Sequence, residues 1–204
     1  MPTPHVNQKA VFLNIPYDAR FRHLYLAYIS GITHLGLVPR ATLEISGGER
    51  RLDRILSLIQ SCCYSIHDLS RVEIDRNPPC STPRFNMPFE LGMTVTWEKM
   101  NPGQHTWFVF ESWNRRLDKS LSDLKGTDPN IHDGTVKGIM RELCNAFVLR
   151  GPQPGVPEMM RSYRLLVREL PEVFNDAGTN DLFQARVFAR LCFVARGIAE
   201  KTRL

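Results

Sequence analysis

Apolar and polar residues alternate along this chain in two patterns, one typical of strands and one of helices. The run Val11-Phe12-Leu13 ends in polar and turn-forming residues, which predicts a short buried strand. Residues 21–36 then repeat apolar positions at the spacing of a helix. A further short apolar run at 37–42 predicts a second strand. The chain therefore begins as strand, helix, strand.

The same alternation continues as far as residue 112. The predicted elements are an amphipathic helix at 51–62, a strand at 63–70, a polar, proline-rich loop at 71–86, a helix that begins near Pro88 and a strand at 106–112. Strands that alternate with helices in this way form a parallel sheet with helices on both faces. We therefore predict the α/β class.

The second half of the chain gives a less regular pattern. Residues 113–135 predict a polar helix or a loop, with a short fifth strand near 130–132, and residues 136–148 predict a helix. Proline and glycine gather at 150–157, which predicts a linker, and two helices are predicted beyond it, at 158–170 and 179–201. We therefore divide the chain into an α/β domain at 1–150 and a helical C-terminal extension at 151–204.

Composition places the chain among ordinary globular proteins. Hydrophobic residues make up 43% of it and charged residues 23%. No apolar run approaches the roughly 18 residues that indicate a membrane span. The first ten residues, MPTPHVNQKA, contain no apolar signal core. We therefore expect a cytoplasmic protein without a membrane partner.

Cysteine, histidine and charge patterns narrow the chemistry further. The five cysteines are odd in number and show no Cys-x-x-Cys spacing, which argues against a disulfide framework or a structural zinc site. The six histidines include no close pair at metal-ligand spacing, so we expect no metal site. The net charge of +5 is spread along the chain and forms no basic tail. We therefore expect no nucleic-acid partner.

Ligands of open parallel sheets bind outside the carboxyl ends of the strands. The residues that follow the predicted strands are therefore the candidates for a site: Asn14, Pro16, Tyr17 and Asp18 after the first, His67, Asp68 and Ser70 after the third, and residues 112–114 after the fourth. The loop at 45–50 lacks the motif of a phosphate loop or a dinucleotide fold, and we interpret Gly47-Gly48 as a turn. The alternative is that its backbone N–H groups meet an anion together with Arg50 or Arg51.

Glu90 follows the third strand, in the helix predicted to begin near Pro88. The simpler interpretation is that this first-turn acid complements the helix dipole, an effect of roughly 0.3–1 kcal/mol. Its neighbours are apolar, however, which predicts a desolvated carboxylate with a raised pKa. These neighbours are Phe85, Met87, Phe89, Leu91 and Met93.

Asp68 supplies a second carboxylate at the same predicted edge of the sheet. Taken alone, it is interpreted as a turn residue that binds its own backbone. Paired with Glu90 across one crevice, it suits chemistry at an anomeric carbon, where one acid stabilises a sugar cation and the other orients the ribose. The substrate class that this pair indicates is an N-glycoside.

The motifs VFLNIPYD, CYSIHDLS and PRFNMPFELGM together resemble the nucleoside 2-deoxyribosyltransferase-like group and the related Toll/interleukin-1-receptor-like (TIR-like) domains of bacteria. The resemblance covers about residues 9–113 and implies a flavodoxin-like three-layer sandwich with a mainly parallel sheet of four or five strands, followed by the C-terminal helices. It also implies that Glu90 is the catalytic glutamate acting at C1′ and that Asp68 is the aspartate near the ribose.

One departure from the family pattern bears on the substrate. The transferases carry an Asp-x-Gly approach to the glutamate, whereas Arg84 and Asn86 occupy the matching positions here. An arginine near the site favours a phosphorylated or dinucleotide substrate over deoxyribosyl transfer. The predicted substrate-binding residues are Asn14, Pro16, Tyr17, Asp18, Ser70, Arg84, Asn86 and Met87.

The resulting hypothesis is a nucleotide N-glycosidase that hydrolyses NAD as substrate, with no cofactor. The resemblance extends to the role of many such bacterial proteins, as toxic effectors in antiphage defence, and to a homo-oligomer or a complex with a defence-system partner. Two alternatives stay open: a non-catalytic nucleotide sensor that docks a partner through its last two helices, and a nucleoside deoxyribosyltransferase.

Overall fold

The computed structural model describes residues 7–44, 50–72, 74–75, 82–114, 116–148 and 153–202. Parts of four predicted segments lie outside these residues. They are residues 45–49 of the loop that contains Gly47-Gly48, residues 73 and 76–81 of the proline-rich loop, residue 115 of the segment at 113–135 and residues 150–152 of the linker.

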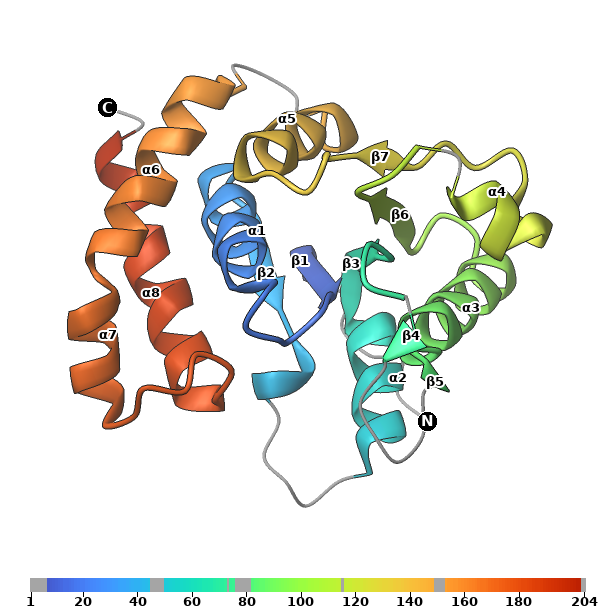
Figure 1. Cartoon of the computed structure of the whole chain (residues 1–204), viewed down its shortest axis with the longest axis horizontal. Helices are drawn as coiled ribbons and strands as arrows, with labels where there is room; N and C mark the ends of the chain where they lie inside the picture. Colours follow the sequence, from blue (N-terminus) through green and yellow to red (C-terminus); the bar gives the residue numbers. More distant parts are fainter. Residues whose placement is uncertain are drawn as a thin grey trace.

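Within the described residues, five parallel strands form one sheet in the order β2-β1-β3-β6-β7 (Figure 1). The order is that of a flavodoxin-like fold, because the chain first builds outward on one side of β1 and then returns to build on the other. The strands are β1 (Asn7–Asn14), β2 (Val38–Arg40), β3 (Cys62–Asp68), β6 (Thr106–Glu111) and β7 (Asn130–Ile131). The predicted α/β class and parallel sheet are confirmed.

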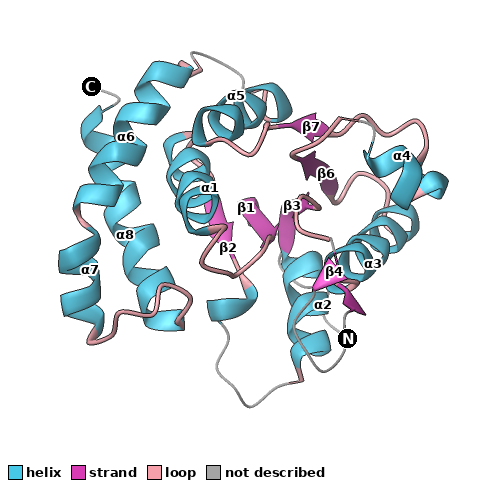
Figure 2. Ribbon diagram, viewed as in Figure 1, coloured by secondary structure: helices cyan, strands magenta, loops and turns pink. Residues whose placement is uncertain are grey.

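Helices cover both faces of this sheet (Figure 2). On one face lie α1 (Arg22–His34) and α5 (Val136–Ala146), and on the other α2 (Arg51–Ser61) and α3 (Asn86–Met100). A short α4 (Arg116–Ser120) and two 3-10 turns, η1 (Thr42–Glu44) and η2 (Ser122–Leu124), lie in the connections.

The C-terminal helices add a further layer outside α1 (Figure 1). They are α6 (Val156–Arg168), α7 (Leu170–Ala177) and α8 (Ala185–Thr202). Because α1 lies between the sheet and these helices, every residue of α1 from Leu24 to His34 is buried. At Gly31, α1 lies so close to α5 and α6 that a side chain would not fit without a shift of its neighbours. A Cβ there would lie 2.5 Å from Leu143 Cδ1 of α5 and 3.2 Å from Met159 Cε of α6.

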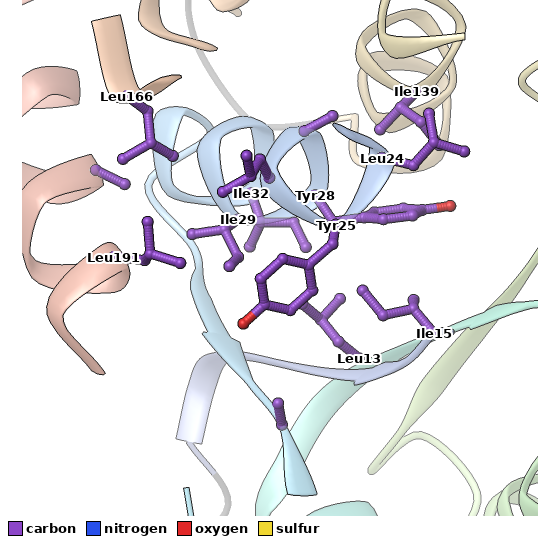
Figure 3. Packing of buried hydrophobic residues seen from close by; sticks show 14 of the residues in the cluster. Leu13, Ile15, Leu24, Tyr25, Tyr28, Ile29, Ile32, Ile139, Leu166 and Leu191 are labelled. Carbon is purple, nitrogen blue, oxygen red and sulfur yellow. The ribbon is translucent and has the colours of Figure 1, made fainter. Parts of the chain in front are cut away.

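One apolar cluster runs from the sheet through α1 to the C-terminal helices (Figure 3). Leu13 of β1 and Tyr25 of α1 belong to it, as do Leu166 of α6 and Leu191 of α8. The predicted C-terminal extension therefore shares its core with the α/β domain.

Several boundaries differ from the predictions for local reasons. The proline-rich loop contains a two-stranded antiparallel ribbon, β4 (Ile74–Asp75) and β5 (Thr82–Pro83). Helix α3 begins at Asn86, so Pro88 is its third residue. The helix predicted at 158–170 ends at Arg168, and a helix that the pattern did not predict, α7, begins at Leu170, because Pro171 suits the first turn of a new helix but not the interior of an old one. Gly178, at φ +62°, then ends α7.

Candidate functional site

The strand order places the topological switch point between β1 and β3. The connection after β1 leads to α1 on one face, whereas the connection after β3 leads to α3 on the other. The two loops separate at this point, so the sheet edge between them is where a flavodoxin-like fold places a ligand. Asn14 ends β1 at this edge, Tyr17 and Asp18 follow it, and α3 carries Glu90.

Glu90 is only 4% exposed, although it carries a carboxylate. Burial raises its pKa from 4.5 to about 7, and the positive charge of Arg51 partly offsets that rise. Arg51 Nη2 lies 3.7 Å from Glu90 Oε1, and the Arg51 side chain is 57% exposed. Near neutral pH Glu90 therefore exists in both protonation states, with one cation open to solvent beside it.

The helix-dipole interpretation of Glu90 is wrong. Because α3 begins at Asn86, Glu90 is the fifth residue of the helix and lies beyond its first turn. The favourable effect of the dipole on an acid falls off within that first turn. The dipole therefore does not account for a buried acid at this position.

Asn14 joins the end of β1 to the start of α3. Its Nδ2 donates to the carbonyl oxygen of Met87 at 3.1 Å and lies 2.9 Å from His67 Nδ1. Because an amide nitrogen only donates, His67 Nδ1 accepts and the ring proton is on Nε2. Met87 contributes its backbone to the site, while its side chain packs against the apolar cluster around Leu91.

A buried chain of polar groups holds His67 in turn. His67 Nε2 lies 3.0 Å from Ser65 Oγ, and Ser65 Oγ lies 2.8 Å from His105 Nε2. His105 Nδ1 donates to the carbonyl oxygen of Cys62 at 2.8 Å. Burial lowers the pKa of His67 to about 3 and also lowers that of His105, so both rings are neutral. These groups fix the orientation of the Asn14 amide.

Tyr17 lies in the electrostatic neighbourhood of Glu90. Its hydroxyl donates to the carbonyl oxygen of Leu13 at 3.2 Å, and its ring packs edge-on against Tyr25. Burial raises the pKa of Tyr17, and the charge of Glu90 adds to that rise. Tyr17 therefore keeps its proton, and its neighbour Pro16 is buried in the same loop.

Asp18 pairs with two arginines. Its Oδ2 lies 3.0 Å from Arg84 Nη1 and 3.4 Å from Arg71 Nε, and its Oδ1 accepts from the backbone N–H of Arg20 and Phe21. Burial opposes ionisation, but the charge of Arg71 and the hydrogen bond from Arg84 lower the pKa of Asp18. Asp18 therefore holds the Arg84 side chain beside the loop that follows β1. Asn86 is exposed at the start of α3.

Asp68 does not converge with Glu90 on one crevice, and this expectation is wrong. Its Oδ2 accepts from Tyr28 Oη at 2.7 Å and lies 3.3 Å from His132 Nε2, both on the face covered by α1 and α5. Its Oδ1 accepts from the backbone N–H of Ser70 at 2.9 Å and from its hydroxyl. Successive strand residues point to opposite faces, so His67 is directed toward α3 and Asp68 away from it.

These contacts make Asp68 a positioning residue. Burial raises its pKa, but the contacts with His132, Ser70 and Tyr28 outweigh burial and lower it. Asp68 is completely buried and ionised, and it fixes the loop that carries Ser70. The predicted role beside the ribose is therefore not supported by its position.

Sequence reasoning missed the roles of Arg51 and of the Ser65–His67–His105 chain. The sequence suggested Arg51 only as an alternative contact for an anion. The feature that could have indicated its role is its position as the first residue of α2. The polar chain had a weaker signal, since a histidine in a strand is commonly a packed core residue. Across the described residues no group of three His, Cys, Asp or Glu side chains is arranged to hold a metal ion. None of the described helices has the length and apolar character needed to cross a membrane.

Comparison with protein-family models gave no match for this chain. Searches of the curated proteins and of the solved structures also gave no match. The resemblance to the deoxyribosyltransferase-like and TIR-like groups therefore stays a prediction based on the motifs themselves.

Proposed function

We propose that this chain cleaves the N-glycosidic bond of a nucleotide, with NAD as the favoured substrate. The observation that supports it most is Glu90: a buried carboxylate with a pKa of about 7 at the switch point of a flavodoxin-like sheet. A desolvated carboxylate stabilises an adjacent cation more strongly than a hydrated one does. The cation that forms at the anomeric carbon of a nucleotide meets that description.

In the proposed reaction the bond between C1′ and the nicotinamide nitrogen breaks, and its electron pair leaves with nicotinamide as a neutral base. Ionised Glu90 stabilises or captures the sugar cation at C1′. A water molecule then supplies the hydroxyl group at C1′, and the proton that it loses passes to Glu90 or to solvent. The products are nicotinamide and ADP-ribose, with atoms and charge balanced.

Arg51, which contacts Glu90, and Asn14, which contacts Met87 of the same helix, fit a nucleotide substrate. The exposed guanidinium of Arg51 beside Glu90 suits a substrate phosphate. The Asn14 amide nitrogen is occupied by His67 and Met87, which leaves its carbonyl oxygen, among the described contacts, to accept a hydrogen bond from a ribose hydroxyl. Asp68 is not part of this proposal, because its carboxylate oxygens already accept hydrogen bonds from Ser70 and from Tyr28 of α1.

We also propose that the protein acts in antiphage defence and that it forms a homo-oligomer. An exposed apolar surface on α2 and α3 is the face on which we place a second copy, because contiguous apolar patches of this kind mark interaction sites. Phe89 of this surface directly precedes Glu90 on α3, so we expect the second copy to lie beside the site. The surface is formed by Leu56, Phe89, Met93, Trp97 and Met100 around a groove of about 580 Å³. Light scattering of the purified chain tests it, with dissociation expected for Phe89→Ser.

The activity is tested by incubating the protein with NAD and a panel of nucleosides and nucleotides while free base is measured by chromatography. We expect nicotinamide release by the wild type, loss of release in Glu90→Gln and full release in Glu172→Gln. Glu172 is the matched control because it is an exposed acid on α7. Equal binding of NAD by wild type and Glu90→Gln, with no product from either, would support the nucleotide sensor instead.

A further inference from the structure

A second cavity lies at the carboxyl ends of β3, β6 and β7, beside the start of α1. Its volume is about 570 Å³, within the range typical of small-molecule sites. Arg20, Ser70, Arg71, Trp113, Asn114 and Asp133 are among the residues that line it. Neither Glu90 nor Asn14 belongs to its lining, so it is distinct from the site of the proposed reaction.

Buried carboxylates hold two of the loops that form this cavity. Asp68 accepts the backbone N–H and the hydroxyl of Ser70. Glu111 Oε1 accepts the backbone N–H of Ser112 at 2.6 Å and that of Trp113 at 3.3 Å. Asp68 and Glu111 are the last residues of their strands and are almost completely buried. The loops that they hold are therefore fixed in position before any ligand binds.

The side chains of Asp18 and His132 hold two further segments that line the cavity. Asp18 Oδ1 accepts the backbone N–H of Arg20 at 3.0 Å and that of Phe21 at 3.1 Å. The backbone N–H of Gly134 donates to His132 Nδ1 at 3.1 Å. A cavity whose lining segments are held by hydrogen bonds is preorganised, which lowers the cost of ordering it around a ligand.

The charges around the cavity favour an anion. Arg116 neutralises Glu111, with Nη2 2.6 Å from Oε1, and Arg141 pairs with Asp133 at 3.1 Å. In the described part of the chain no carboxylate pairs with the guanidinium of Arg20, which therefore keeps its charge for a ligand. Arg71 lines the same cavity beside it, although Asp18 shares its charge.

An exposed aromatic ring supplies a contact of a different kind. Trp113 is 69% exposed while its backbone is fixed by Glu111. A solvent-facing tryptophan on the wall of a cavity is a stacking surface for a flat heteroaromatic ring. Asn114, the next residue, adds an amide that both donates and accepts hydrogen bonds.

We propose that this cavity binds a nucleoside monophosphate, with the base stacked on Trp113, the ribose beside Asn114 and the phosphate between Arg20 and Arg71. The proposal is independent of the N-glycosidase activity, because it uses none of the residues around Glu90. It adds a second nucleotide site at the carboxyl edge of the same sheet.

The test is calorimetric titration of AMP into the Glu90→Gln protein, a background in which the proposed reaction does not consume the ligand. We expect saturable binding that Trp113→Ala and Arg20→Gln each weaken by about tenfold or more, which corresponds to the value of a base-stacking or charged contact. Adenosine and inorganic phosphate, titrated separately, are each expected to bind more weakly than AMP.

Two controls make the result specific to the cavity. Phe193→Ala removes an equally exposed aromatic ring from α8, and Arg161→Gln removes an exposed cation from α6, so both should bind AMP as the parent protein does. The proposal is overturned if AMP shows no saturable binding at millimolar concentration. It is also overturned if Trp113→Ala and Arg20→Gln bind AMP as tightly as the controls do.

Discussion

At the scale of single residues, Glu90 is an acid whose burial opposes its own ionisation. The pKa is raised from 4.5 in the unfolded chain to about 7 in the folded protein. Between these two values the folded protein binds more protons than the unfolded chain does, so the free energy of unfolding falls as pH rises through this window. Such a cost is typical of functional positions, where stability is given up for reactivity.

This cost predicts a stabilising substitution. Glu90→Gln removes the ionisable group, so it should raise the free energy of unfolding at pH 8 by roughly 1–3 kcal/mol and change it little at pH 4.5. Urea unfolding of both proteins at the two pH values measures the difference. A variant that is no more stable than the wild type at pH 8 would contradict the burial of an ionised Glu90.

Burial raises the pKa of Glu90, and Arg51 partly offsets that rise. Because the charge of Arg51 lowers the pKa of Glu90, Arg51→Gln should move the midpoint of the pH–rate profile for nicotinamide release to higher pH. The neighbouring Arg50→Gln is the control, since Arg50 is exposed and it is Arg51 that contacts Glu90. Equal midpoints for the two variants would show that Arg51 does not act on Glu90.

At the scale of elements, the polar chain beneath Asn14 fixes β1 against α3. His67→Leu removes one of the two hydrogen-bond partners of the Asn14 amide nitrogen and of Ser65 Oγ in a buried place, which should lower the free energy of unfolding by roughly 1–3 kcal/mol. The loss should be smaller at pH 6 than at pH 8, because at pH 6 the imidazole of the unfolded chain binds a proton that buried His67 does not, which already lowers the stability of the wild type. A loss that appears only at pH 6 would mean that the ring carries a charge.

The elements themselves could largely be predicted from the sequence, because the strands and helices differ in the period of their apolar residues. The start of α3 was misplaced because Pro88 suits the first helical position but lies at the third. The edge residues Asn14, Asp18 and Asp68 could be predicted from topology alone. The face of the sheet toward which a strand-end side chain points could not be predicted. His67 and Asp68 are both polar, so the pattern does not show which of the two is directed toward α3.

At the scale of the whole molecule, the C-terminal helices complete the core around α1. Leu191 of α8 is fully buried in the same cluster as the sheet residues. Leu191→Ala should therefore lower the free energy of unfolding by roughly 2–5 kcal/mol. Both proteins should unfold in one transition when followed by circular dichroism and by tryptophan fluorescence. A separate early transition confined to the variant would indicate that the C-terminal helices fold on their own.

We claim that Glu90 acts directly in cleaving an N-glycosidic bond. The test compares kcat for nicotinamide release from NAD by the wild type and by Glu90→Gln. Both proteins must first show the folded circular dichroism spectrum. We predict release by the wild type and a loss of at least about 10²-fold in kcat for the variant, the scale of a catalytic acid or base. Equal rates for the two folded proteins would contradict the claim.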